Sequence, residues 1–276
     1  MSGSTFIRVR PSPIAGTWYP GNPDTLTEMV DAFLENPTDQ TFRLNAPLRG
    51  LLTPHAGMRF SGGVAGKAFR YARGLDVDVV VVISPSHHLF DADLVSTAYT
   101  HYETPLGRVP VALDLVDRLA AEIPLGRVAK DPEHAVEIGL PFLQRTLDHF
   151  ELLPLSMLDQ SWRYSEKLGQ VLARLLKNRK VLLVASSDLS HFYINETARL
   201  LDATILNAVA DYHPAEIIQA DEQGRGFACG RGAIAAVMVA AKALGATQAT
   251  IVGYATSGEI NHDLSKVVGY GAALFN

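Results

Sequence analysis

The chain of 276 residues has room for one large domain or two small ones, and with 47% hydrophobic and 19% charged residues it can bury a sizeable core. Its net charge of −5, without a basic cluster, excludes the positive surfaces that bind nucleic acids or membranes, and no apolar run approaches the roughly 18 residues of a membrane span. Cys229 is the only cysteine and the first residues lack the apolar core of a secretory signal, so we expect a disulfide-free, cytoplasmic protein.

Apolar periodicity and turn residues predict the elements in the first half of the chain. Residues 1–13 are expected to form a flexible tail, and residues 14–276 a single domain. A helix is predicted at 24–34, where Asp24 suits the N-cap position. The other predicted elements are strands at 50–52, 79–83 and 93–99, helices at 61–73 and 113–121, and a hairpin at 101–113.

The second half continues the alternation of helices and strands. Residues 133–150 are predicted to form a helix that Pro141 either kinks or limits in its first segment. The apolar run at 181–184 is typical of a strand buried on both faces. The other predicted elements are helices at 165–177, 196–212, 214–220 and 232–244, strands at 151–157, 249–254 and 267–275, and a glycine-rich loop at 221–232. Together they predict a three-layer α/β/α fold around a mostly parallel, mixed central sheet.

Three predicted apolar strands each end shortly before a histidine. The strands at 50–52, 79–83 and 181–184 are followed by His55, His87 and His191, respectively. Ligands of open α/β sheets bind at the carboxyl ends of the strands, so we expect the three imidazoles to share one site. Neutral imidazole is the commonest metal ligand in proteins, which makes this a candidate metal site. The alternative is three separate histidines that cap helices or bond the backbone.

Two further residues near the predicted strand ends carry reactive groups. Asp188 lies three residues before His191, so a helical turn would place both side chains on one face. Asp188 could ligate a metal, orient a histidine or cap a helix. Cys229 lies just before a predicted helix and next to Arg231, a setting that lowers a thiol pKa and favours the thiolate. The alternative for Cys229 is a buried thiol that behaves as a small hydrophobic group.

Aromatic and acidic residues supply weaker candidates. Trp18 and Tyr19 could form the wall of a pocket or belong to the core. His134 and Glu137 are three residues apart on the predicted helix, so they could form a proton relay or the first turn of that helix. The glycine-rich loop lacks the spacing of dinucleotide or phosphate loops and does not follow a strand, which argues against nucleotide binding.

Seven short motifs give a resemblance to a known family. They are AGTWYP at 15–20, PHAG at 54–57, SPSHH at 84–88, ETPLG at 103–107, EHAVEIGLPFLQ at 133–144, SSDLSH at 186–191 and CGRG at 229–232. In this order they resemble the Memo family, whose members occur beside AMMECR-type and radical-SAM proteins in the grouping called AmmeMemoRadiSam. The resemblance covers about residues 14–275 and implies a functional link to those two protein types.

The Memo family is similar to class III extradiol dioxygenases, which are non-haem Fe(II) enzymes with an α/β fold. This resemblance implies a metal held by His55 and His87, and an acid/base role for His191. The third ligand of the dioxygenases is a glutamate, and in the Memo pattern Cys229 takes its place. Memo-like proteins are also implicated in peptide binding, in copper or iron binding and in redox signalling.

Two functions of different classes follow from these features. The first is a metal-dependent oxidoreductase with Fe(II), or else copper or zinc, in which His191 and Asp188 are catalytic. Its metal ligands would come from His55, His87, His191 and Cys229, and its substrate would contact Trp18, Tyr19, His134 and Arg231. The second is a non-enzymatic module that binds a metal or a peptide in the same cleft. An enzyme leaves exchangeable positions open on its metal, whereas a structural site closes them.

Overall fold

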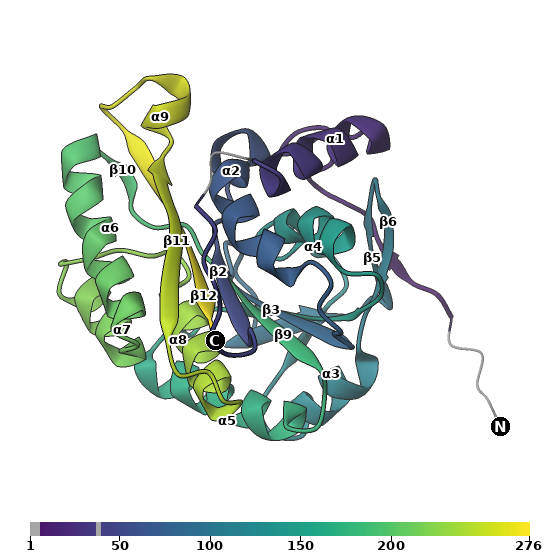
Figure 1. Cartoon of the computed structure of the whole chain (residues 1–276). Coiled ribbons are helices and arrows are strands. Elements are labelled where there is room, and N and C mark those ends of the chain that lie inside the picture. Colours follow the sequence, from purple (N-terminus) through teal and green to yellow (C-terminus); the bar gives the residue numbers. More distant parts are fainter. Residues whose placement is uncertain (1–5, 37–39) are drawn as a thin grey trace.

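The computed structural model describes residues 6–36 and 40–276, and a nine-stranded mixed sheet lies at the centre of this part (Figure 1). The strands follow the order β10 (His191–Tyr193), β12 (Val267–Phe275), β2 (Gly50–Thr53), β9 (Val181–Ser186), β3 (Val79–Pro85), β8 (Glu151–Met157), β4 (Leu94–Thr97) and β7 (Gly126–Val128), and β11 (Ala249–Thr256) also pairs with β12. The inner strands β2, β9, β3 and β8 are parallel to one another. β12 and β4 flank them in the antiparallel direction, so the sheet is mixed as predicted.

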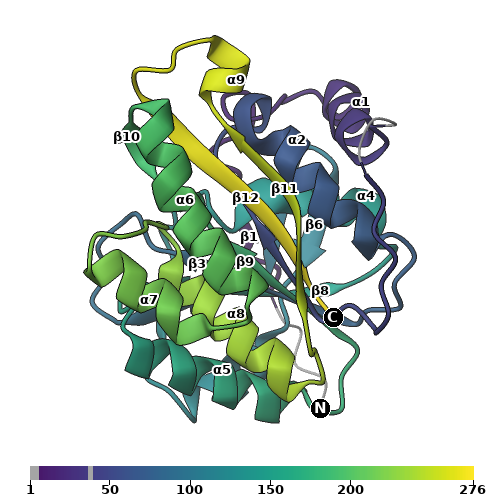
Figure 2. The ribbon, with the colours of Figure 1, turned by 60° about the vertical axis from the view of Figure 1, so that its left-hand side comes forward.

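Helices cover both faces of this sheet, which confirms the three-layer α/β architecture. On one face, α2 (Met58–Phe69) packs on β2, β11 and β12, and α1 (Pro23–Leu34) and α4 (Leu140–Thr146) pack against α2. On the other face, α8 (Arg231–Ala243) packs on β2, β3 and β9, and α5 (Trp162–Leu176) covers α8. The alanine-rich α8 is buried because it lies between the sheet and α5 (Figure 2).

The remaining helices lie around this core. They are α3 (Leu113–Ala120), α6 (Asn195–Ala210), α7 (Pro214–Glu222) and α9 (Gly258–Asn261). α6 packs on β11 and β12 and reaches α7, which in turn contacts α8. No helix in the described ranges combines the length and the apolar character that crossing a bilayer requires.

The helix predicted at 133–150 is wrong in most of its length. The chain forms a 3₁₀ turn at Glu137–Gly139 and then only the seven residues of α4, which end at Thr146. Pro141 stands in the first turn of α4, where its missing N–H costs nothing, so it starts a helix instead of kinking one. Residues 129–136 are therefore free to form the irregular loop that reaches the sheet edge.

The flexible tail expected at 1–13 is also wrong for its later residues, whereas residues 1–5 lie outside the described ranges. β1 (Val9–Arg10) pairs in parallel with β5 (His101–Thr104), which forms the predicted hairpin with β6 (Gly107–Pro110). Arg10 is only 1% exposed and forms ion pairs with Asp131 and Glu137. Buried ionic contacts, which short-range sequence patterns do not reveal, therefore hold this segment in place.

Candidate metal centre

A cleft of about 460 Å³ opens at the carboxyl edge of the parallel strands. His55 follows β2 by two residues, His87 follows β3 by two, and His191 follows β9 by five. The structure brings six of the predicted site residues together in the lining of this cleft: Trp18, His55, His87, His134, Asp188 and His191. The three strand-end histidines therefore share one site, as their placement in the sequence predicts.

His55 is buried, and its hydrogen bonds fix which ring nitrogen is free. Its Nδ1 lies 3.0 Å from Ser186 Oγ. The Ser186 hydroxyl donates its only proton to the Ala135 carbonyl at 2.6 Å, so it accepts a hydrogen bond from His55 Nδ1–H. His55 Nε2 then carries a lone pair and lies 3.3 Å from Cys229 Sγ. Burial, followed by the charge of His87, lowers the pKa of His55 to about 3, so the ring is neutral at pH 7 as a metal ligand requires.

His87 is held by a residue that sequence reasoning missed. Its Nδ1 lies 3.0 Å from a carboxylate oxygen of Glu133, which is only 2% exposed. Burial lowers the pKa of His87, but the hydrogen bond and the charge of Glu133 outweigh it and the net shift is upward. The pKa of Glu133 is shifted to about 2, because hydrogen bonds from His87 outweigh the opposing effect of burial. The carboxylate is therefore ionised and leaves His87 Nε2 as the nitrogen available to a ligand.

Cys229 completes a group of possible metal ligands with the two histidines. The donor atoms of His55, His87 and Cys229 all lie within 4.8 Å of one another. The predicted fall in the thiol pKa is wrong, since burial and then the charge of Asp188 raise it. Arg231 does not oppose this effect because its guanidinium pairs with Asp221 at 3.4 Å. Without a metal, Cys229 is a protonated thiol.

The chemistry of this donor set fits a first-row transition metal. Metal bonds of about 2.0–2.3 Å place neighbouring donors of a tetrahedral site about 3.5 Å apart. The 3.3 Å between Cys229 Sγ and His55 Nε2 already matches that spacing. Two imidazoles and a thiol suit zinc, copper and iron better than magnesium or calcium. A second set of possible ligands, His87, Glu133 and His134, shares one histidine with the first.

Asp188 and His191 lie beside the donor group, but not on a helix. Residues 187–190 are irregular and His191 begins β10, so the expected helical turn is wrong and Asp188 does not cap a helix in this segment. Instead, Asp188 Oδ1 accepts hydrogen bonds from the amides of His55 at 2.8 Å and Ala56 at 3.3 Å. Asp188 Oδ2 lies 3.9 Å from His55 Nε2. Asp188 therefore holds the His55 loop and faces the metal ligands.

The imidazole of His191 has a ring nitrogen that is available to a ligand. Its Nε2 is buried and has no hydrogen-bond partner among the described residues. Burial lowers its pKa, an effect that the charge of Asp188 partly offsets. The next residue, Phe192, has a left-handed backbone with φ of 64° and a side chain that is 71% exposed at the cleft. Such conformations are costly for residues other than glycine and cluster at functional sites.

The predicted substrate-binding residues divide into two pairs. Trp18 and His134 line the cleft, and their ring centroids are 4.1 Å apart. Tyr19 is 3% exposed and donates a hydrogen bond to Glu137 at 2.6 Å, so it belongs to the core. Arg231 is occupied by its ion pair with Asp221. Neither Tyr19 nor Arg231 is among the residues that line the cleft, so the structure does not support the predicted substrate contact for these two residues.

Arg10 fixes the loop that carries Glu133 and His134. Its guanidinium donates to the carboxylates of Asp131 and Glu137 and to the main-chain carbonyl of Glu133. Glu137 is fully buried and is bound by Arg10, Ser12 and Tyr19. The alternative of a proton relay between His134 and Glu137 is therefore wrong, because Glu137 serves the ion-pair network.

Replacing Arg10 by lysine is expected to destabilise the protein by about 2 kcal/mol, because the ammonium keeps the charge but leaves buried acceptors without donors. Arg108→Lys is the matched control, since Arg108 is exposed and its ion-pair partner among the described residues is the half-exposed Glu103. Its expected change is within about 0.5 kcal/mol. Urea unfolding of both variants measures the difference. Equal stabilities would contradict the structural role of the Arg10 network.

Asp188→Asn is expected to stabilise the metal-free protein at alkaline pH. Burial raises the pKa of Asp188 from 3.8 to about 6, so folded protein holds this proton more tightly than unfolded chain. The resulting stability is present at low pH and is lost as the pH rises through about 6. Asparagine stays neutral and still accepts from the His55 and Ala56 amides. The free energy of unfolding of the variant, relative to that of wild type, should rise by on the order of 2 kcal/mol from about pH 4 to about pH 8. Urea unfolding of both proteins at the two pH values measures this change. A gap that does not change with pH would contradict the burial of this charge.

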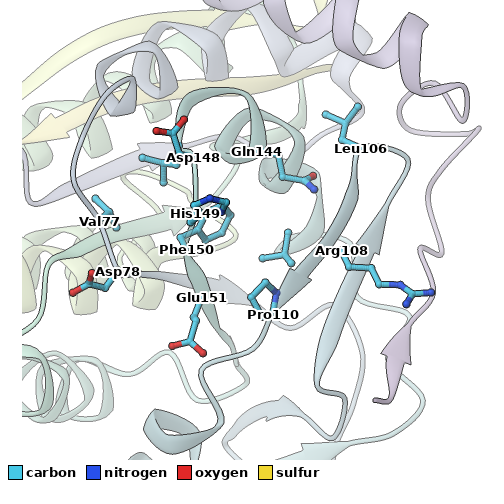
Figure 3. Close-up of a pocket in the computed structure, with 12 residues that line it drawn as sticks. Val77, Asp78, Leu106, Arg108, Pro110, Gln144, Asp148, His149, Phe150 and Glu151 are labelled. Carbon is cyan, nitrogen blue, oxygen red and sulfur yellow. The ribbon is translucent and has the colours of Figure 1, made fainter. Parts of the chain in front are cut away.

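A separate cavity of about 520 Å³ lies at the opposite, amino edge of the strands (Figure 3). Asp78 and Glu151, at the starts of β3 and β8, are among its labelled residues, together with His149. None of the predicted site residues lines it. Six of the predicted site residues line the cleft at the carboxyl edge instead.

Comparisons with known proteins identify the family of this chain. The model of the family described as Memo-like protein matches residues 10–274. A MEMO1 family protein from Nitrosopumilus maritimus is 31% identical over 97% of this chain and 99% of its own length. A MEMO1 family protein from Methanosarcina barkeri is 32% identical over 96% and 99%, respectively. The solved structure of an uncharacterized protein from Escherichia coli covers 83% of this chain and 100% of its own, with 13% identity and a TM-score of 0.46. The chain belongs to the Memo-like protein family.

Proposed function

We propose that this Memo-like protein is a metal-dependent oxidoreductase that holds iron or copper in the cleft and acts on a small molecule there. The observation that carries the proposal is the convergence of His55, His87 and Cys229, whose donor atoms lie within 4.8 Å of one another beside an open cleft. Three protein ligands leave further positions on the metal for a substrate or an oxidant, as in catalytic centres. The resemblance to extradiol dioxygenases supports the same class of reaction.

The residues around the metal ligands have separate roles in the proposed reaction. A bound iron or copper ion would supply electron transfer to O₂ or to another small oxidant. His191 can accept or deliver a proton at Nε2, which has no other partner among the described residues. Asp188 faces His191 with a negative charge that favours the protonated imidazole. Trp18 and Phe192 provide apolar surface at the cleft against which a small molecule can pack.

The thiol of Cys229 supports a second candidate function. The facial triad of non-haem Fe(II) oxygenases uses a carboxylate, whereas a thiolate is a softer ligand that favours Cu(I) or zinc. A non-enzymatic module that binds a metal, or a peptide at the same cleft, is therefore the alternative. The exposed Phe192 and Trp18 give such a peptide an apolar surface.

Anaerobic metal loading followed by elemental analysis tests both candidates. Purified protein is incubated separately with Fe(II), Cu(I) and Zn(II), desalted and analysed, and oxygen uptake is then followed with small-molecule reductants. One ion per chain with oxygen uptake above that of a His87→Ala variant supports the oxidoreductase. One ion per chain without uptake supports the binding module. A wild-type protein that retains no ion contradicts the oxidoreductase and the metal-binding form of the module, and leaves only peptide binding.

A further inference from the structure

We propose that Glu133 is the positioning residue of the metal centre, which fixes His87 in the Nδ1–H tautomer and directs its Nε2 to the metal. The proposal rests on the metal site described above and adds a residue that sits 46 positions from the ligand it serves. In metal sites of this kind, the histidine commonly donates its second nitrogen to a carboxylate, which fixes the ring orientation and raises the basicity of the ligand.

Glu133 holds His87 at two points. One carboxylate oxygen accepts from the His87 amide at 2.6 Å, and the other lies 3.0 Å from the ring Nδ1. The His87 side chain is 32% exposed, and its ring stacks on that of His134 with centroids 4.7 Å apart. Glu133 is almost fully buried at 2%. The fixed partner in this pair is therefore the carboxylate, and the ring takes its orientation from it.

Glu133 is suited to a supporting role and not to metal ligation, although it belongs to the second set of possible ligands with His87 and His134. Its Oε1 also accepts hydrogen bonds from the amides of His134 at 2.9 Å and Ala135 at 3.0 Å, and lies 3.3 Å from His134 Nδ1. Its Oε2 accepts from the His87 amide. A cation at this carboxylate would have to displace several of these bonds, each of which satisfies a buried or half-buried donor.

The loop around Glu133 is itself held from both sides. Arg10 donates to the Glu133 carbonyl, and the Glu133 amide donates to Asp131 Oδ1 at 3.0 Å. Because Arg10 belongs to β1, the N-terminal strand and the metal centre are joined through Glu133. A carboxylate fixed in this way can hold a ring that is partly exposed.

The test combines two variants with two readouts. Glu133→Gln keeps the shape but weakens the bond to Nδ1–H and opposes the His87 amide with its own NH₂ group, and Glu133→Ala removes the partner. Glu103→Gln is the matched control, because Glu103 is half-exposed, pairs with Arg108 and does not line the cleft. The first readout is NMR of the imidazole nitrogens in metal-free protein, which reports the tautomer. The second is equilibrium titration with Zn(II), which reports affinity and the number of ions per chain.

Wild type should show His87 as the Nδ1–H tautomer and bind one zinc ion per chain. Both Glu133 variants should show mixed tautomers and bind zinc about 10–100-fold more weakly at unchanged stoichiometry. Wild-type His87 in the Nε2–H tautomer, or variants with wild-type affinity, would overturn the positioning role while the metal site stands. Loss of one of two bound ions would overturn it by making Glu133 a ligand of a second centre. Absence of zinc binding in wild type would remove zinc from the metals of the proposed site, and the tautomer would still decide whether Glu133 fixes His87. If Glu133→Ala fails to fold, Glu133→Gln and the wild-type spectrum decide.

Discussion

Replacement of His55 or His87 by alanine is expected to abolish stoichiometric metal binding. Each change removes one of three donors that lie within 4.8 Å of one another and leaves only two protein ligands. Structural zinc sites with four ligands bind with about 10–16 kcal/mol, so one lost ligand costs about 3 kcal/mol, a few hundredfold in affinity. At micromolar protein concentrations the ion should then be lost during desalting.

His88→Ala is the matched control for this loss. His88 is the neighbour of His87, but it is exposed, and successive side chains of an extended chain point apart. It should therefore bind one ion per chain like wild type, with unchanged affinity. Elemental analysis after anaerobic loading compares the three variants, and thermal melting confirms that each one folds. Full binding by both His55→Ala and His87→Ala would remove these residues from the metal centre.

The histidine cluster could be predicted because its signal is local. A short apolar run fixes where a buried strand ends, and the parallel arrangement brings all such ends to one edge of the sheet. His55, His87 and His191 follow their strands within a few residues, so errors of one or two positions in the strand ends do not matter. The same logic fails for Asp188, because the helical turn expected there depended on the detailed path of residues 187–190.

Residues whose roles depend on distant partners could not be predicted. Glu133 bonds His87 across 46 positions, and Arg10 bonds Glu137 across 127. The acid directly before His134 was a visible signal for Glu133, but it competed with the helix pattern at 133–150 that the structure does not contain. The nearby Arg231 predicted a lowered thiol pKa for Cys229, but the Arg231 guanidinium pairs with Asp221 and not with the thiol. The roles of Glu133, Arg10 and Arg231 therefore depend on ion pairs with residues of other elements.

Metal binding is expected to displace the proton of Cys229. Burial and then the charge of Asp188 raise the pKa of the Cys229 thiol, so this thiol is protonated at neutral pH in the metal-free protein. A metal ion binds the deprotonated thiolate. His55 is already neutral and releases no proton when it binds. Zinc titration calorimetry in buffers with different ionisation enthalpies, at protein concentrations high enough to saturate the weakened variant, should therefore show about one more proton released per bound ion by wild type than by Cys229→Ala. Equal proton release by the two proteins would place Cys229 outside the centre.

The same thiolate separates the two candidate functions. A soft ligand in place of the dioxygenase carboxylate should favour Cu(I) and zinc, so Cys229→Ala should lose much more affinity for these ions than for Fe(II). In wild type, the metal-bound sulfur of Cys229 is also open to oxidation by an activated oxidant nearby. We therefore expect little or no catechol ring cleavage by the Fe(II)-loaded wild type, together with alkylation of Cys229 that is slower with metal than without. Oxygen uptake on catechols and alkylation rates measure the two effects. Robust ring cleavage would show that a thiolate can serve where the dioxygenases use a carboxylate. Alkylation unaffected by metal would return the third ligand position to His191 or Asp188, two other donors that line the cleft.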